Sequence, residues 1–171
     1  MKSSKALLEQ DELVVEVEIA VPPERVFQAL TDAKQLFAWW GKEPSVELSV
    51  FEMDARSGGR WQFQCKPAAG AGHGAVGEQL RRNGAREFEA HGEVLEYVPP
   101  RLLVWSWVAN WHEHPAHPTT VRWDLTPTTP TTKGTRVRVT HIGLTQEPIS
   151  RKDYQSGWQG VLRLLIQFLE E

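Results

Sequence analysis

The sequence predicts an α+β fold in which a curved antiparallel sheet of about six to seven strands wraps around a long C-terminal helix, with two short helices after the first strand. Two observations carry this prediction. Short runs of alternating apolar and polar residues recur along most of the chain, separated by segments rich in Gly and Pro. Near the C-terminus the apolar residues change to helical spacing. No internal repeat and no linker divides the sequence, so we expect one domain over residues 1–171 with a core of about 12–170.

Composition and charge exclude several classes of function. The chain has 19 basic and 22 acidic residues and a net charge of −3, which provides no basic surface for nucleic acid. No apolar run is long enough to span a bilayer, there is no polybasic anchor, and the charged segment Met1–Leu13 does not resemble a signal peptide. Cys65 is the only cysteine, so no internal disulfide can form. We therefore expect a cytoplasmic protein that binds neither nucleic acid nor a membrane.

The first elements are a strand and two short helices. Residues 13–19 alternate between apolar and polar side chains, as in a strand with one buried face. Prolines at 22–23 end this strand and lead into a helical segment over 24–30, because proline is well tolerated in the first turn of a helix. A second short helix carries the aromatic residues of 36–40 and is closed by Gly41.

Six further strands are predicted from the same alternation. They cover residues 46–53, 60–65, 88–97, 101–108, 120–125 and 135–141. Residues 66–86 contain several Gly and Arg residues, and we predict a long flexible connection there, well beyond the usual hairpin loop of about two to five residues.

The C-terminal segment has the pattern of an amphipathic helix of about four turns. Its apolar residues are Trp158, Val161, Leu162, Leu165, Phe168 and Leu169. Only this helix is long enough to cover one face of the sheet, which must be buried against another element. The sequence therefore predicts a helix-grip fold, an arrangement that leaves a space between sheet and helix.

Four segments carry a resemblance to a known family. In sequence letters they are VPPERVFQALTD with LFAWWG, GGRW, GEVLEYVPPRL with WSW, and GTRVRVTH with the later GW. The chain resembles the START-like (SRPBCC, birch-pollen-allergen-like) superfamily over about residues 12–170. Within it, the chain is similar to the branch of the activator of heat-shock chaperone ATPase homologue. The resemblance implies a helix-grip fold, but no particular activity, since the branch shares no catalytic motif. The segment of residues 66–86 is longer than the corresponding segment that the resemblance implies for this branch.

The eight tryptophans point to a ligand site inside the predicted grip. If alternation holds, aromatic side chains from several strands face the same interior as the apolar stripe of the last helix. The predicted cavity-lining, ligand-binding residues are Phe37, Trp40, Trp61, Phe63, Trp105, Trp107, Trp123, His141, Trp158, Val161 and Leu165. An aromatic-lined concave space is the usual composition of a small-molecule site. The alternative is that the tryptophans fill the space and leave no cavity.

Several residues have side chains suited to catalysis or metal binding. His141 could be an acid–base group, although a hydrogen-bonded buried histidine is commoner. The run His112-Glu113-His114 with His117 has zinc-ligand types, but prolines 115 and 118 favour a solvated loop. Cys65 has no histidine partner in a nucleophilic pattern, so we expect a buried, inert thiol. We predict no catalytic residue, no metal and no cofactor.

Three classes of function follow. The first is a module that binds a small hydrophobic or aromatic molecule between sheet and helix. The second, implied by the resemblance, is a protein-interaction or chaperone-cofactor module, which would expose an apolar patch using Trp111, Leu102 or Val104. The third is an enzyme, cyclase-like or hydrolase-like, using the same cavity with His141. A homodimer through Val104 and Val108 is also left open, and the sequence favours a role that is not enzymatic.

Overall fold

The structure, a computed structural model, describes residues 11–129 and 133–171. Its elements in chain order are β1 (Glu12–Ile19), α2 (Pro23–Thr31), α3 (Ala33–Trp39), β2 (Val46–Met53), β3 (Arg60–Pro67), α4 (Gly74–Arg82), β4 (Phe88–Val98), β5 (Leu102–Ala109), β6 (Thr119–Pro127), β7 (Thr135–Ile142) and α5 (Pro148–Glu170). All seven predicted strands are present, with ends within two residues of the prediction.

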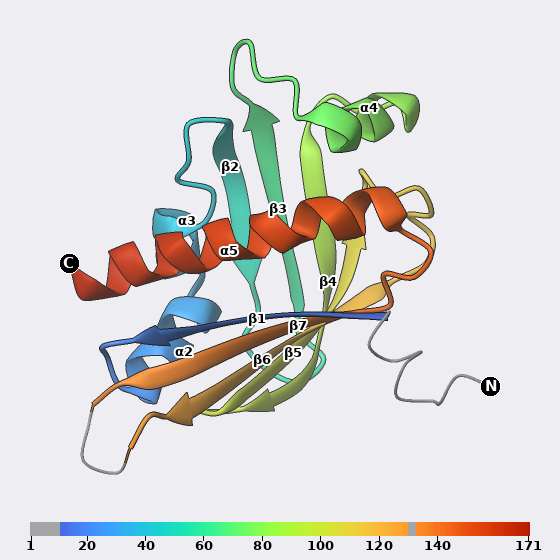
Figure 1. The fold of residues 1–171 in the computed structure, drawn as a ribbon. Helices are drawn as coiled ribbons and strands as arrows, with labels where there is room; N and C mark the ends of the chain where they lie inside the picture. The colour runs from blue at the N-terminus through green and yellow to red at the C-terminus, as the bar shows by residue number, and fades with distance from the viewer. Residues whose placement is uncertain (1–10, 130–132) are drawn as a thin grey trace.

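One antiparallel sheet organises the molecule, with the strand order β1-β7-β6-β5-β4-β3-β2. The sheet curls, and α5 lies across its concave side, while α2 and α3 lie beside the sheet near the C-terminal half of α5 (Figure 1). This arrangement confirms the predicted helix-grip fold. None of the described helices combines the length and the apolar character that crossing a bilayer requires.

The two short helices form where the sequence predicts them, for local reasons. Pro22 and Pro23 place α2 directly after β1, with proline in the first turn where no backbone N–H is needed. Asp32 is the N-cap of α3, and its side chain accepts a hydrogen bond from the backbone N–H of Lys34 at 3.0 Å. The closely spaced caps hold Trp39 and Trp40 against the core, where both are buried.

Residues 66–86 differ from the predicted flexible connection, because they contain the helix α4. Val76 and Leu80 lie one helical turn apart and both are buried. The glycines that obscured this pattern have a packing reason at Gly77, where a Cβ atom would lie 2.1 Å from the carbonyl oxygen of Gly72. The helix therefore packs so closely on the preceding loop that position 77 has no room for a side chain.

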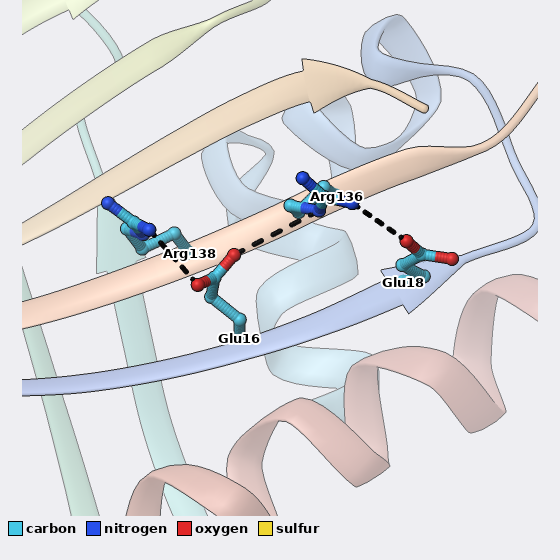
Figure 2. A network of polar contacts seen from close by, with 4 residues as sticks. All are labelled: Glu16, Glu18, Arg136 and Arg138. Atoms are coloured by element: carbon cyan, nitrogen blue, oxygen red, sulfur yellow. Dashed lines mark hydrogen bonds and ion pairs between the residues drawn. The ribbon is translucent and has the colours of Figure 1, made fainter. Parts of the chain in front are cut away.

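The outer face of the sheet is charged and partly paired. Figure 2 shows that Arg136 of β7 pairs with Glu18 of β1 at 3.2 Å, and Arg138 pairs with Glu16 at 3.1 Å. The β1–β7 register places each arginine opposite its partner. Because these side chains are exposed, the pairs add little stability. They do keep charged residues on the convex face and leave the concave face to apolar side chains.

The expected exposed patch around Leu102, Val104 and Trp111 is a wrong prediction, since all three side chains are buried, at 5%, 5% and 7% exposure. Trp111 faces the interior. Leu102 and Val104 lie on the outer face, where the register sets them beside the ion-paired residues Arg122 and Asp124 of β6. Long charged side chains can cover apolar neighbours with their aliphatic stems. Alternation alone cannot reveal such cover.

A test of this packing is Gly92→Ala in β4. A Cβ atom at this position would lie 1.9 Å from the carbonyl oxygen of Ser106 and 2.8 Å from Nε1 of Trp61. Those two atoms form a hydrogen bond of 3.0 Å that joins β3 to β5 across the glycine. We expect the variant to lose roughly 2 kcal/mol or more of unfolding free energy, measured by urea denaturation.

The matched control is Gly157→Ala in α5, where an added Cβ atom meets nothing within 4 Å. Alanine is the better helix former, so this variant should gain about 0.5–1 kcal/mol. Equal unfolding midpoints for the two variants would contradict this account of Gly92.

Candidate functional site

A cavity of about 750 Å³ lies between α5, the start of α4 and the part of the sheet formed by β2, β3 and β4. Its aromatic lining residues are Trp40, Phe63, Phe88, Trp107, Trp111, Tyr154 and Trp158. Its polar lining residues are Glu43, Ser45, Cys65, His73, Lys152, Asp153 and Ser156. The aromatic groups come from the strands, the segment after α3 and one side of α5. The charged groups come from the loop before β2 and from α5.

Five predicted site residues line this cavity. They are Trp40, Phe63, Trp107, Trp158 and Val161. Alternation along β3 and β5 and the helical stripe of α5 bring them together, as the sequence analysis expected. That they contact a ligand is still a prediction.

The other six lie elsewhere. Trp61, Trp105, Trp123, His141 and Leu165 are at most 1% exposed and are not among the cavity-lining residues. Trp105 lies with its ring centroid 5.0 Å from that of Trp61 and 5.7 Å from that of Trp123, so these rings fill the deeper part of the grip. Phe37 lies on α3, 43% exposed, with the ammonium of Lys42 5.5 Å from its ring centroid. The grip is therefore filled in its depth and open towards α4.

His141 is held in a defined neutral tautomer beneath the cavity. Nε1 of Trp158 is only a donor, and it donates to Nδ1 of His141 at 3.1 Å, so Nδ1 carries no proton. The proton is therefore on Nε2, which donates to Oγ1 of Thr119 at 2.8 Å, and that hydroxyl donates to the carbonyl oxygen of Trp107 at 3.2 Å. Complete burial, and to a smaller extent the charge of a protonated His112, lower the pKa of His141 well below its usual value. Both ring nitrogens are occupied, which leaves none free for acid–base chemistry.

A second buried group joins the wall of the cavity to the loop after β5. The hydroxyl of Tyr154 accepts a hydrogen bond from Nε1 of Trp107 at 2.9 Å and lies 2.7 Å from Nε2 of His112. His112 was expected in a solvated loop, and that prediction is wrong, because its side chain is 0% exposed. Burial lowers the pKa of His112 to about 4.

Glu147, just before α5, holds the loop after β5 against the interior of the protein. Its carboxylate is buried and accepts hydrogen bonds from the backbone N–H groups of Glu113, at 2.6 Å, and His114, at 2.8 Å. The loop is therefore fixed by a carboxylate that is distant in sequence. Among the described residues, no group of three or more His, Cys, Asp or Glu side chains could hold a metal ion.

The thiol of Cys65 lines the cavity and is protonated at neutral pH. Burial raises its pKa to about 12, with a further contribution from the negative charge of Glu43. A protonated thiol is a poor nucleophile.

Several lining residues were missed by the sequence analysis. Tyr154 lies four residues before Trp158 and therefore on the same face of α5, so helical spacing is the signal that identifies it. His73 and Phe88 flank α4, and their rings meet edge to face with centroids 4.9 Å apart. Their place in the lining depends on α4, and the sequence predicts a flexible connection there instead of a helix. Glu43 sits in a loop, where no periodicity indicates which way it faces.

Comparison with known proteins supports the fold. A family model described as Activator of Hsp90 ATPase homolog 1-like protein matches residues 20–170. No curated protein matches the sequence.

A protein from Chromobacterium violaceum superposes with a TM-score of 0.72 at 21% identity, over 94% of this chain and 99% of the other. One from Mesorhizobium loti has a TM-score of 0.61 at 26% identity, over 93% and 96%. An HSP90 activator from Plasmodium falciparum has a TM-score of 0.60 at 19% identity, over 90% and 91%. The chain shares the fold of these proteins.

The buried histidines make stability depend on pH. In the unfolded chain a histidine titrates near its ordinary pKa of 6.5, whereas folded His112 titrates at about 4. Between these values the unfolded state binds a proton that the folded state does not. The unfolding free energy is therefore fully present above about pH 6.5 and falls as the pH is lowered, with roughly 3 kcal/mol lost by pH 4 through His112 alone. Chemical denaturation between pH 7.5 and 4.5 measures this loss.

The variant His112→Gln should reduce the slope of unfolding free energy against pH by up to about 1.4 kcal/mol per pH unit below pH 6.5. The control is His91→Gln, which changes an exposed histidine of β4. If the wild type and His112→Gln lose stability in parallel as the pH falls, His112 is not the group responsible.

Proposed function

This chain belongs to the family of Activator of Hsp90 ATPase homolog 1-like proteins, and from that membership and the cavity we propose that it binds a small hydrophobic or aromatic molecule between the sheet and α5. The observation that carries the proposal is the cavity itself. A volume of about 750 Å³ lies within the usual range of small-molecule sites, which is about 300–1,000 Å³. Most of its lining residues are apolar or aromatic and the remainder are polar, which is the usual composition of such sites.

Two glycines inside α5 add support. Gly157 and Gly160 line the cavity, and a Cβ atom at either position would meet nothing within 4 Å. Glycine in the interior of a helix costs about 0.5–1 kcal/mol relative to alanine. No neighbouring atom requires this loss, so packing of the protein alone does not account for the glycines. A molecule lying against the helix backbone at this point would account for them.

A chaperone-cofactor role is the second candidate, and family membership is what favours it. A protein partner usually requires a contiguous apolar surface. Among the described residues, the large apolar side chains that are exposed are Val14, Phe37 and Leu95, which lie on three different elements. This distribution fits a partner surface less well than the cavity fits a small molecule. An enzymatic role loses its candidate group, because His141 does not line the cavity and both its ring nitrogens are bonded.

The first test is native mass spectrometry of the purified protein, compared with its mass after denaturation. We expect a co-purifying species of fixed mass below about 1 kDa, the size that a cavity of this class encloses. The bound species should be displaced by an excess of a neutral aromatic probe, 2-naphthylmethanol. If calorimetry detects no binding of this probe to the emptied protein at millimolar concentration, the proposal fails.

The second test fills the cavity without weakening the helix. Gly160→Leu should place an isobutyl group in open space and improve helix propensity, so the unfolding free energy should be kept or raised. Affinity for 2-naphthylmethanol should fall by about tenfold or more, because the leucine occupies its volume. The control is Gln159→Leu, which adds the same side chain at an exposed position outside the cavity lining. Equal affinity in both variants would place the probe elsewhere.

A further inference from the structure

Two carboxylates of exposed residues line the cavity at its mouth. Glu43 lies in the loop before β2, and Asp153 lies on α5. Among the described residues, neither carboxylate forms an ion pair within 4 Å or a side-chain hydrogen bond, whereas Glu16 and Glu18 of the outer face are paired. Burial raises the pKa of Asp153, and the charge of His73 partly opposes that shift. Two acidic side chains from different elements are therefore left available at one opening.

The negative charge of these carboxylates reaches the cavity walls. The pKa of Cys65 is raised chiefly by burial and further by Glu43. The pKa of Tyr154 is raised well above its usual value, first by burial and then by the charges of Asp153 and Glu147, against the hydrogen bonds from Trp107 and Trp111. The pKa of Cys65 on β3 is thus raised by Glu43, and the pKa of Tyr154 on α5 is raised by Asp153.

The aromatic walls add to this potential and offer few donors to an anion. Trp107 and Trp158 use their N–H groups inside the protein, on Tyr154 and His141, so they present ring surface to the cavity. The faces of indole rings carry negative electrostatic potential and attract cations. The ring of His73 donates through Nε2 to the carbonyl oxygen of Ser45 at 3.0 Å, which occupies that donor as well.

Two basic residues line the same cavity, His73 and Lys152, and Lys152 carries the ammonium group. Lys152, Glu43 and Asp153 are all exposed, but the ammonium of Lys152 is carried on a long flexible stem and can move into water, whereas the short side chain of Asp153 keeps its carboxylate near the opening. The charges of Lys152, Glu43 and Asp153 sum to a net negative charge at neutral pH. The balance of the lining therefore favours a cation over an anion.

We propose that the molecule bound in the cavity is an aromatic cation, with its ring system among Trp40, Trp107 and Trp158 and a protonated amine at the mouth between Glu43 and Asp153. This inference rests on the proposed ligand-binding function and specifies the chemical class of its ligand. The rings of the ligand fill the apolar volume, and its positively charged ammonium group pairs with the two carboxylates.

The experiment compares three probes that share one ring system and differ in charge. They are 2-naphthylmethylamine as the cation, 2-naphthylmethanol as the neutral analogue and 2-naphthoate as the anion. Isothermal titration calorimetry at low salt and neutral pH should show the cation binding about tenfold tighter than the alcohol and the anion binding weakest. Raising the ionic strength should reduce the advantage of the cation and leave the alcohol unchanged.

Isosteric variants identify the groups responsible. Glu43→Gln and Asp153→Asn should each weaken binding of the amine by about fivefold and leave binding of the alcohol unchanged. The control is Glu47→Gln, which makes the same change of net charge at an exposed position of β2 outside the cavity lining. Lys152→Gln should tighten binding of the amine or leave it unchanged, and should not improve binding of the naphthoate.

The outcomes separate this inference from the function on which it rests. If the alcohol binds and the amine binds no more tightly, the cationic class is wrong while the cavity remains a binding site. If the amine is preferred but Glu47→Gln weakens it as much as Glu43→Gln does, the preference reflects net charge and the assignment to the mouth is wrong. If none of the three probes binds, both proposals fail.

Discussion

The indole of Trp158 joins the long helix to the sheet, and the rest of the architecture depends on that contact. Its ring lies 5.6 Å, centroid to centroid, from the rings of both Trp107 and Trp123, and its N–H bonds His141 of β7. A helix laid across a curved sheet must bury polar atoms as well as apolar surface, and an unpaired buried donor would cost about 1–3 kcal/mol. The bond to His141 removes that cost and fixes the tautomer of the histidine. Large-to-small substitution of such a ring costs about 3–5 kcal/mol.

The same helix both closes the deep part of the grip and opens its mouth, and the difference follows from the side chains along it. Where α5 carries Leu162 and Leu165, both side chains are fully buried in the core, and the space is filled. Where it carries Gly157 and Gly160, no side chain reaches the sheet, and α4 stands beside the opening. The cavity therefore lies where α5 carries glycine, beside the start of α4.

The fold could be predicted from the sequence because strands with one buried face show a clear alternation of apolar and polar residues. Alternation in β3 and β5 correctly indicated which tryptophans face inward. It could not indicate how deep each inward ring lies, so Trp105 and Trp107, two residues apart on one strand, were predicted to be equivalent although only Trp107 lines the cavity. The position of His112 depends on Glu147, which is 35 residues away, and no local pattern reports such a contact. Glycine within α4 likewise hid a short helix whose packing requires it.

The features that local stability does not explain gather in one place. Glycines in a helix interior, unpaired carboxylates and a half-open aromatic cavity all lower or fail to raise stability, and proteins usually keep such features where function requires them. Here Gly157 and Gly160, Glu43 and Asp153 all line one cavity. On the sheet, Glu16, Glu18 and Asp124 are ion-paired with arginines. Among the described residues, the buried side-chain atoms without a hydrogen-bond partner are Nε1 of Trp105 and Trp123, Nδ1 of His112 and Oγ of Ser150. The two helix-interior glycines beside the mouth, which no packing contact requires, are the physical support for the ligand site proposed between α5 and the loop before β2.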